Sequence, residues 1–221
     1  MNIQIGDIDL FYEQEGQGAP LILIHGNGED HTIFDKIIGP LSRDFTVYAL
    51  DSRGHGSSTP VDAFDYREMA EDIHGFIQAL ELEKPAVYGF SDGGIIGLML
   101  AYQYPELLSK LIVSGANTTP DGLKEVWLDK FRRAYERTGK DSIKMMLEQP
   151  NISNADLAKI KIPVLVTAGS DDMIEDDHTR YIADSIPDSS LQIYDGETHE
   201  SYVEHNPKMA AVIRNFLLSG Q

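Results

Sequence analysis

The fold is decided by residues 87–95, which read VYGFSDGGI. A serine between two glycines at G-x-S-x-G spacing is a weak signal alone, because a chain with 19 glycines can match it by chance. Here, however, Ser91 stands where an apolar strand ends and an apolar helix begins, which is the setting of a nucleophile elbow. Glycines on both sides allow the strained turn and the close approach of helix to strand. We therefore predict that Ser91 is a nucleophile rather than an inert turn residue.

Strand-like and helix-like patterns alternate on both sides of this elbow. Apolar runs typical of strands covered on both faces lie at 21–24, 46–50, 86–90, 111–114 and 163–168, with a last strand expected at 190–194. Helical patterns lie at 66–82, 95–104, 180–186 and 207–218. Residues 3–12 alternate around a Gly-Asp turn, which predicts an antiparallel hairpin. The order predicts an α/β fold, a mostly parallel sheet with helices on both faces.

Residues 117–161 interrupt this alternation. They contain two amphipathic helical patterns, at about 123–137 and 142–149, and no strand. We interpret the segment as a small helical lid inserted into a single domain that spans residues 1–221, although an ordinary crossover with a broken helix stays open. The apolar stripes of the insertion carry Trp127, Phe131, Met145, Met146 and Leu147. Some of these side chains face the active site in our interpretation, and docking of the lid is the equal alternative.

A serine nucleophile needs a histidine base and a carboxylate that orients it. Of the seven histidines, His199 has the best position, after the last strand and before the final helix. The carboxylate is expected between serine and histidine in the chain, and the sequence GSDD at 169–172 follows a strand. We predict a catalytic triad of Ser91, Asp172 and His199, with Asp171 as the alternative carboxylate.

An oxyanion hole is the third requirement of this chemistry. The sequence HGNG at 25–28 follows the first buried strand, and its glycines free the backbone to direct an N–H inward. We predict that the backbone N–H groups of Asn27 and Asp92 form the hole. The Asp92 side chain is expected to project toward the pocket, with a side chain turned away from the pocket as the alternative.

Composition excludes several classes of function. The formal charge is 18 − 36 = −18, which repels nucleic acid and anionic membrane surfaces. The chain has no cysteine, so disulfides and thiolate metal sites are excluded. Residues 1–10 lack the pattern of a signal peptide, and no run of about 18 apolar residues occurs, so we expect a cytoplasmic protein. The acidic run at 175–177 before His178 lacks the spacing of an EF-hand loop, and we expect neither metal nor cofactor.

These segments resemble the α/β-hydrolase superfamily over nearly the whole chain. The resemblance rests on the elbow, on HGNG at 25–28, on DSRGHGSS at 51–58, on the G-x-x-D at 169–172 and on the histidine loop. The esterase and enol-lactonase-like branch is the most similar. GFSDGG at 89–94 also resembles the valacyclovir-hydrolase-like group, whose acid after the nucleophile contacts a substrate amino group. Ser91 excludes the dehalogenase and epoxide-hydrolase branches, which use an aspartate there.

The resemblance and the residues together predict a serine hydrolase that acts on a small carboxylic ester or lactone through an acyl-enzyme. Hydrolysis of a carbon–carbon bond, hydrolysis of an aminoacyl ester, and ligand reception on a hydrolase scaffold stay as alternatives. Phe90, Asp92 and Trp127 are the residues expected to contact substrate. The oligomeric state stays open.

Overall fold

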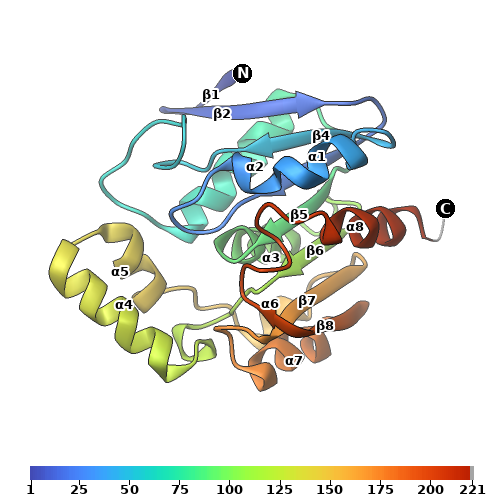
Figure 1. The fold of residues 1–221 in the computed structure, drawn as a ribbon. Coiled ribbons are helices and arrows are strands. Elements are labelled where there is room, and N and C mark those ends of the chain that lie inside the picture. Colours follow the sequence, from blue (N-terminus) through green and yellow to red (C-terminus); the bar gives the residue numbers. More distant parts are fainter. Residues whose placement is uncertain (220–221) are drawn as a thin grey trace.

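The computed structural model describes residues 1–219, which form one eight-stranded sheet with helices on both faces (Figure 1). The strands are β1 (Asn2–Ile5), β2 (Ile8–Glu15), β3 (Ala19–Ile24), β4 (Phe45–Leu50), β5 (Ala86–Phe90), β6 (Leu111–Ser114), β7 (Val164–Asp171) and β8 (Ser189–Thr198). The helices are α1 (Asp35–Leu41), α2 (Tyr66–Ala79), α3 (Asp92–Gln103), α4 (Glu125–Thr138), α5 (Asp141–Glu148), α6 (Asn154–Leu157), α7 (Asp176–Ser185) and α8 (Lys208–Leu218), with short 3-10 turns η1 (His31–Phe34) and η2 (Pro120–Gly122).

The sheet is parallel except at one edge. Its strand order is β1-β2-β4-β3-β5-β6-β7-β8. Strands β1 and β2 form the predicted antiparallel hairpin, and β2 pairs antiparallel with β4. Every other neighbouring pair is parallel. The predicted α/β fold class is therefore confirmed.

Two apolar layers hold the helices on the sheet. Helices α2, α3 and α7 contribute to a core on one face, and α1 and α8 contribute to a second core on the other. The central strands are apolar at successive positions because both of their faces are covered; β5 is buried throughout its length. Helix α3 lies in the middle of its layer, and all residues from 92 to 101 are buried, as its uniformly apolar sequence predicts.

Two departures from the predicted elements have local causes. Helix α1 has no counterpart in the sequence analysis, because Gly39 and Pro40 lie inside its seven residues and weaken the helical signal. It forms nevertheless, since Ile37 and Leu41 are buried against the sheet. The final helix begins at Lys208, one residue later than the pattern at 207–218 predicts, because Pro207 is its N-cap.

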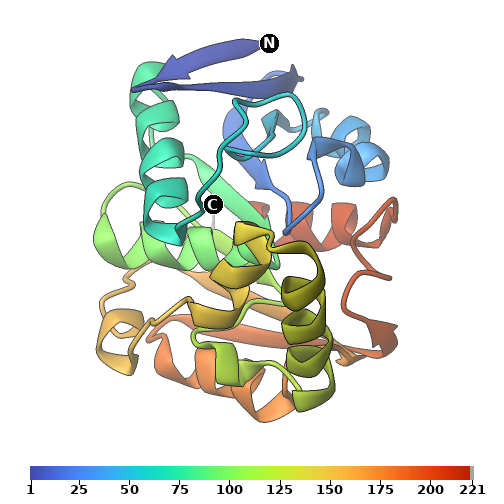
Figure 2. The same cartoon turned by 90° about the vertical axis from the view of Figure 1, so that its left-hand side faces the viewer.

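Helices α4 and α5 stand outside both layers. They lie between β6 and β7 in the chain, where the sequence predicts two helices and no strand. The two pack against each other and project to one side of the sheet (Figures 1 and 2). Asp141 of α5 is tied to the core, because its carboxylate accepts the Phe64 N–H at 2.7 Å.

Candidate active site

Ser91 is the single residue that connects β5 to α3. Its φ of 51° and ψ of −115° belong to a region where a non-glycine residue is strained. The surrounding structure enforces this conformation. The Ser91 N–H donates to the carbonyl of Ser114 at 2.8 Å. The helix also approaches so closely that a Cβ atom at Gly93 would lie 2.1 Å from the carbonyl oxygen of Ile24. The serine side chain is consequently presented at the sharp turn that the sequence predicts.

Ser91, His199 and Asp172 form a line of hydrogen bonds. His199 Nε2 lies 3.0 Å from Ser91 Oγ, and His199 Nδ1 lies 2.6 Å from Asp172 Oδ1. Asp172 directly follows β7 and His199 directly follows β8, so the ends of parallel strands bring both to the elbow. Both side chains are buried. Asp171, the alternative carboxylate, is exposed and is the last residue of β7.

Asp172 is held in its ionised form. Burial opposes ionisation, but the hydrogen bond with His199 and the amides of Ile174 and Gly169 outweigh burial, and the pKa of Asp172 is lowered. The two amides donate at 3.0 Å and 3.3 Å. A carboxylate beside Nδ1 keeps the hydrogen on that nitrogen, so Nε2 is left to accept the proton of Ser91.

The two amides predicted for the oxyanion hole flank the serine. The Asp92 N–H is the first of α3, and the first amides of a helix have no partner within it. Asn27 follows β3 and lines the same cavity as Ser91. Within residues 1–219, neither amide donates a hydrogen bond to the protein. Both N–H groups are therefore free for a ligand oxygen.

The Asp92 side chain does not project into the cavity, contrary to expectation. Its Oδ1 accepts the Tyr66 hydroxyl at 2.7 Å, and its Oδ2 accepts the Asn27 side-chain amide at 3.0 Å. The side chain is buried, and burial raises its pKa in spite of these two hydrogen bonds. The carboxylate is directed toward Tyr66 and the side chain of Asn27, because these two residues donate its hydrogen bonds. The geometry gives no support to contact between Asp92 and a substrate amino group.

A cavity of about 200 Å³ opens onto Ser91 and His199. The cavity is lined by the apolar side chains of Phe90, Phe131, Met146 and Met173 and by the acidic residues Glu29, Glu200 and Glu204. Phe90 also contacts the His199 ring, with centroids 4.9 Å apart. Larger cavities lie elsewhere, one of about 390 Å³ beside α2 and one of about 580 Å³ under the α4–α5 turn, and neither includes Ser91.

The predicted lid residues divide between the cavity and packing. Phe131 and Met146 line the cavity, whereas Met145 is buried in the core beneath α2 and α3. Trp127 is not part of the cavity wall. It packs with Leu147 in a small separate cluster, and the Lys130 ammonium lies 3.6 Å from the centre of its ring. The expected contact between Trp127 and substrate therefore finds no support in this geometry.

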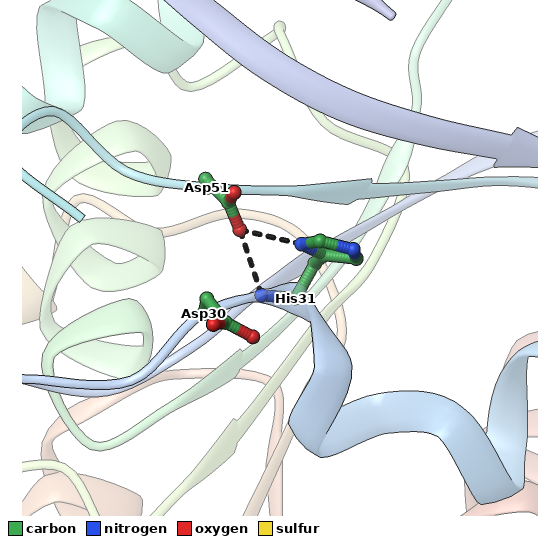
Figure 3. Close-up of side chains that lie close together, drawn as sticks. All are labelled: Asp30, His31 and Asp51. Carbon is green, nitrogen blue, oxygen red and sulfur yellow. Dashed lines mark hydrogen bonds and ion pairs between the residues drawn. The ribbon is translucent and has the colours of Figure 1, made fainter. Parts of the chain in front are cut away.

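One cluster away from Ser91 has the composition of a metal site. The side chains of Asp30, His31 and Asp51 converge (Figure 3). Asp51 Oδ1 lies 2.7 Å from His31 Nδ1 and accepts the His31 N–H at 2.8 Å, while its Oδ2 accepts the Ser57 N–H at 2.8 Å. Asp51 thus anchors the 51–58 turn through hydrogen bonds. His178, which follows the acidic run at 175–177, accepts the Thr118 N–H at 2.9 Å.

Comparison with known proteins identifies the family of the chain. The model of the alpha/beta hydrolase fold family matches residues 19–145, more than half of the chain. The chain belongs to this family. It is accordingly a hydrolase, as the sequence predicts. Within residues 1–219, no helix is long and apolar enough to cross a membrane.

Several relatives of this α/β hydrolase cover nearly its full length. The serine hydrolase BPHL of Homo sapiens is 28% identical over 97% of this chain and 85% of its own. The AB hydrolase superfamily protein YisY of Bacillus subtilis is 25% identical over 95% of both. Among solved structures, an esterase from Thermogutta terrifontis superposes with a TM-score of 0.84, 24% identity and 98% coverage of both chains. The enol-lactonase of Burkholderia xenovorans LB400 gives 0.82 at 19% identity, covering 98% of this chain and 99% of that one. At these identities the structures support the fold.

Proposed function

We propose that this α/β hydrolase cleaves small carboxylic esters or lactones through an acyl-enzyme on Ser91. The observation that carries the proposal is the hydrogen-bonded line from Ser91 Oγ through His199 to Asp172, with the serine at a strained turn. This arrangement matches what an activated serine nucleophile requires, a base in contact and a carboxylate behind the base. The names of the relatives support the class of reaction.

The proposed reaction uses the chain's own groups at each step. Ser91 Oγ attacks the carbonyl carbon while His199 Nε2 takes the hydroxyl proton. The N–H groups of Asn27 and Asp92 hold the developing oxyanion. His199 then gives its proton to the leaving oxygen and next activates a water molecule, which releases the acid and restores Ser91. For a lactone, the alcohol and the acid leave as one molecule.

Cavity size favours a small substrate. About 200 Å³ is less than the roughly 300–1,000 Å³ typical of pockets for drug-sized ligands. Its apolar wall suits a short acyl chain, and Phe131 and Met146 of α4 and α5 supply part of that wall. We propose on this ground that residues 117–161 form the lid of a single domain. The cytoplasmic location stays a prediction, and the oligomeric state stays open.

Labelling of Ser91 by a fluorophosphonate probe tests the proposal most directly, with Ser91→Ala as the unlabelled control. A substrate panel then follows, in which p-nitrophenyl esters of increasing acyl length, simple lactones and aminoacyl esters are assayed with both proteins. We expect wild type to be labelled and to prefer short esters or lactones. Absence of labelling would favour a ligand receptor, and turnover of a diketone in preference to all esters would favour carbon–carbon hydrolysis.

A further inference from the structure

Glu29 holds the loop that carries one proposed oxyanion donor. Its Oε2 accepts the Gly26 N–H at 2.7 Å, and its own N–H donates to the Gly26 carbonyl at 3.4 Å. The same carbonyl oxygen lies 2.7 Å from His25 Nδ1. Because the C=O and N–H of a trans peptide point in opposite directions, a fixed Gly26 carbonyl fixes the direction of the Asn27 N–H. Glu29 therefore bears on the geometry of the oxyanion hole without touching a reacting atom.

The loop has little room to move around this contact. Gly26 lies against the nucleophile, and a Cβ atom built on it would be 3.0 Å from Ser91 Cβ and 2.8 Å from the Glu29 carboxylate. His25 is buried, and its Nε2 accepts the Ser52 N–H at 3.0 Å, so its hydrogen is on Nδ1 and donates to Gly26. Loss of the Glu29 contact would leave the Gly26 amide without its acceptor beside Ser91.

The carboxyl of Glu29 faces that of Glu204. Burial, then the side chain of Glu204, raise the pKa of Glu29 to about 9, with Asp92 adding to the rise and the Gly26 amide opposing it. Glu29 lines two cavities. The first also contains His199 and Glu200, and the second contains the further ionisable groups Asp30, His55, Asp62, Lys140 and Asp141. With this raised pKa, Glu29 keeps its proton at neutral pH.

A neutral Glu29 suits the proposed chemistry. Negative charge beside a developing oxyanion opposes the transition state, so an ionised Glu29 would act against the two amide donors. We propose that Glu29 is a positioning residue whose carboxyl holds the N–H of Gly26, the residue before the proposed Asn27 donor, and that the proton on Glu29 is required for turnover. Loss of that proton then sets the alkaline limit of activity. The inference rests on the proposed function of Ser91.

Rate profiles against pH test the inference in four variants. Esters whose leaving group does not ionise are used from pH 6 to 11, and each kcat/KM profile is normalised to its own maximum. Glu29→Gln keeps an acceptor for the Gly26 N–H but cannot ionise, whereas Glu29→Ala removes the acceptor. Glu204→Gln removes the neighbouring charge. Glu200→Gln is the matched control, because it removes a charge from the same cavity without contact to Gly26.

Wild type is expected to lose kcat/KM above about pH 9, by roughly tenfold per pH unit as one proton is lost. In Glu29→Gln this falling limb disappears, and in Glu204→Gln it moves to lower pH, because less repulsion opposes the ionisation of Glu29. Glu200→Gln keeps the wild-type limb. Glu29→Ala loses roughly tenfold or more in kcat at every pH, with KM changed much less. An unshifted limb in Glu29→Gln, or wild-type kcat in Glu29→Ala, overturns the inference.

Two further measurements separate this inference from the proposed function. Infrared spectra at pH 8 are expected to show a protonated carboxyl band in wild type that is missing from Glu29→Gln. Absence of the band in wild type overturns the proposed proton on Glu29, whether or not an ester is turned over. Fluorophosphonate labelling of wild-type Ser91 reports on the proposed function alone. Labelled, active enzyme with an unshifted limb in Glu29→Gln refutes only the role of Glu29.

Discussion

Replacing Gly115 by alanine should damage the site although Gly115 carries no side chain. Gly115 follows β6 with a φ of +62°, and a Cβ atom there would lie 2.6 Å from His199 Cε1 and 2.8 Å from His199 Nδ1. Real Cβ atoms essentially never approach below 3.0 Å, so the imidazole must move.

The size of the movement follows from ordinary contact distances. Van der Waals contact begins at 3.4 Å, so the ring is displaced by 3.4 − 2.6 = 0.8 Å. Directed away from Ser91, a displacement of this size stretches the present 3.0 Å between His199 Nε2 and Ser91 Oγ to 3.0 + 0.8 = 3.8 Å, beyond hydrogen-bonding range. A misplacement of about 1 Å at a reacting group costs on the order of 10²-fold in rate. We expect kcat of Gly115→Ala to fall by about that factor.

The variant Gly6→Ala is a control that separates backbone strain from displacement of the His199 imidazole. Gly6 has nearly the same φ, +60°, but nothing lies within 4 Å of its added Cβ. Both substitutions carry the penalty of a left-handed alanine, about 1–2 kcal/mol. Only Gly115→Ala should lose kcat in an ester assay, while thermal unfolding shifts in both variants. Wild-type kcat in Gly115→Ala, or equal losses in the two variants, would refute the reasoning.

Further predictions concern the proposed catalytic triad, Glu29 and the lid. Ser91→Ala should abolish activity, and Asp172→Asn should lower kcat by about 10⁴-fold, since the imidazole then takes the wrong tautomer. The pKa of Glu29 rises from 4.5 to about 9 on folding, so between these pH values the folded state retains a proton that the unfolded state loses. The free energy of unfolding therefore falls as the pH rises from 4.5 to about 9. Glu29→Gln lacks this contribution to the pH dependence of stability, so the Tm of Glu29→Gln relative to wild type should increase from pH 5 to 9. Phe131→Ala should alter KM across an acyl-length series, whereas Trp127→Ala should lower Tm with uniform kinetics.

Each of these expectations has an outcome that contradicts it. Asp171→Asn is the matched control for the carboxylate, and a larger loss there than in Asp172→Asn would reassign it. A Tm difference for Glu29→Gln that is constant with pH would mean that Glu29 does not retain its proton on folding. Length-dependent KM values in Trp127→Ala would return Trp127 to the cavity wall.

Much of the fold could be predicted because its signals are local. The central strands are apolar at successive positions, and Ser91 lies directly between β5 and α3, so the elbow is visible within nine residues. His199 and Asp172 could be selected by chain order and by their places after strands. Helix α1 escaped prediction because Gly39 and Pro40 oppose its formation locally, and burial of its apolar face overrides them.

The features that could not be predicted depend on distant contacts. Glu29 and Glu204 are 175 residues apart, and no motif connects Glu204 to the raised pKa of Glu29. The direction of the Asp92 side chain is set by Tyr66, which no spacing rule connects to the elbow. Phe131 and Met146 line the cavity while Trp127 packs with Leu147, a division that the similar apolar stripes of the insertion do not reveal. In each case the residue is visible in the sequence, but its role depends on contacts with residues far away in the chain.

The attachment of α4 and α5 has a consequence for how such a protein can change. The segment that contains them leaves the sheet after β6 and returns at β7, and these two strands are direct neighbours, with Ser114 opposite Thr167. Its two ends are thus fixed a strand spacing apart, whatever lies between them. Insertions, deletions or exchange of the whole segment would leave the sheet register, the elbow and the histidine loop in place. Substrate range can therefore diverge among descendants, or be redesigned by grafting another segment, while the residues proposed for bond cleavage are inherited intact.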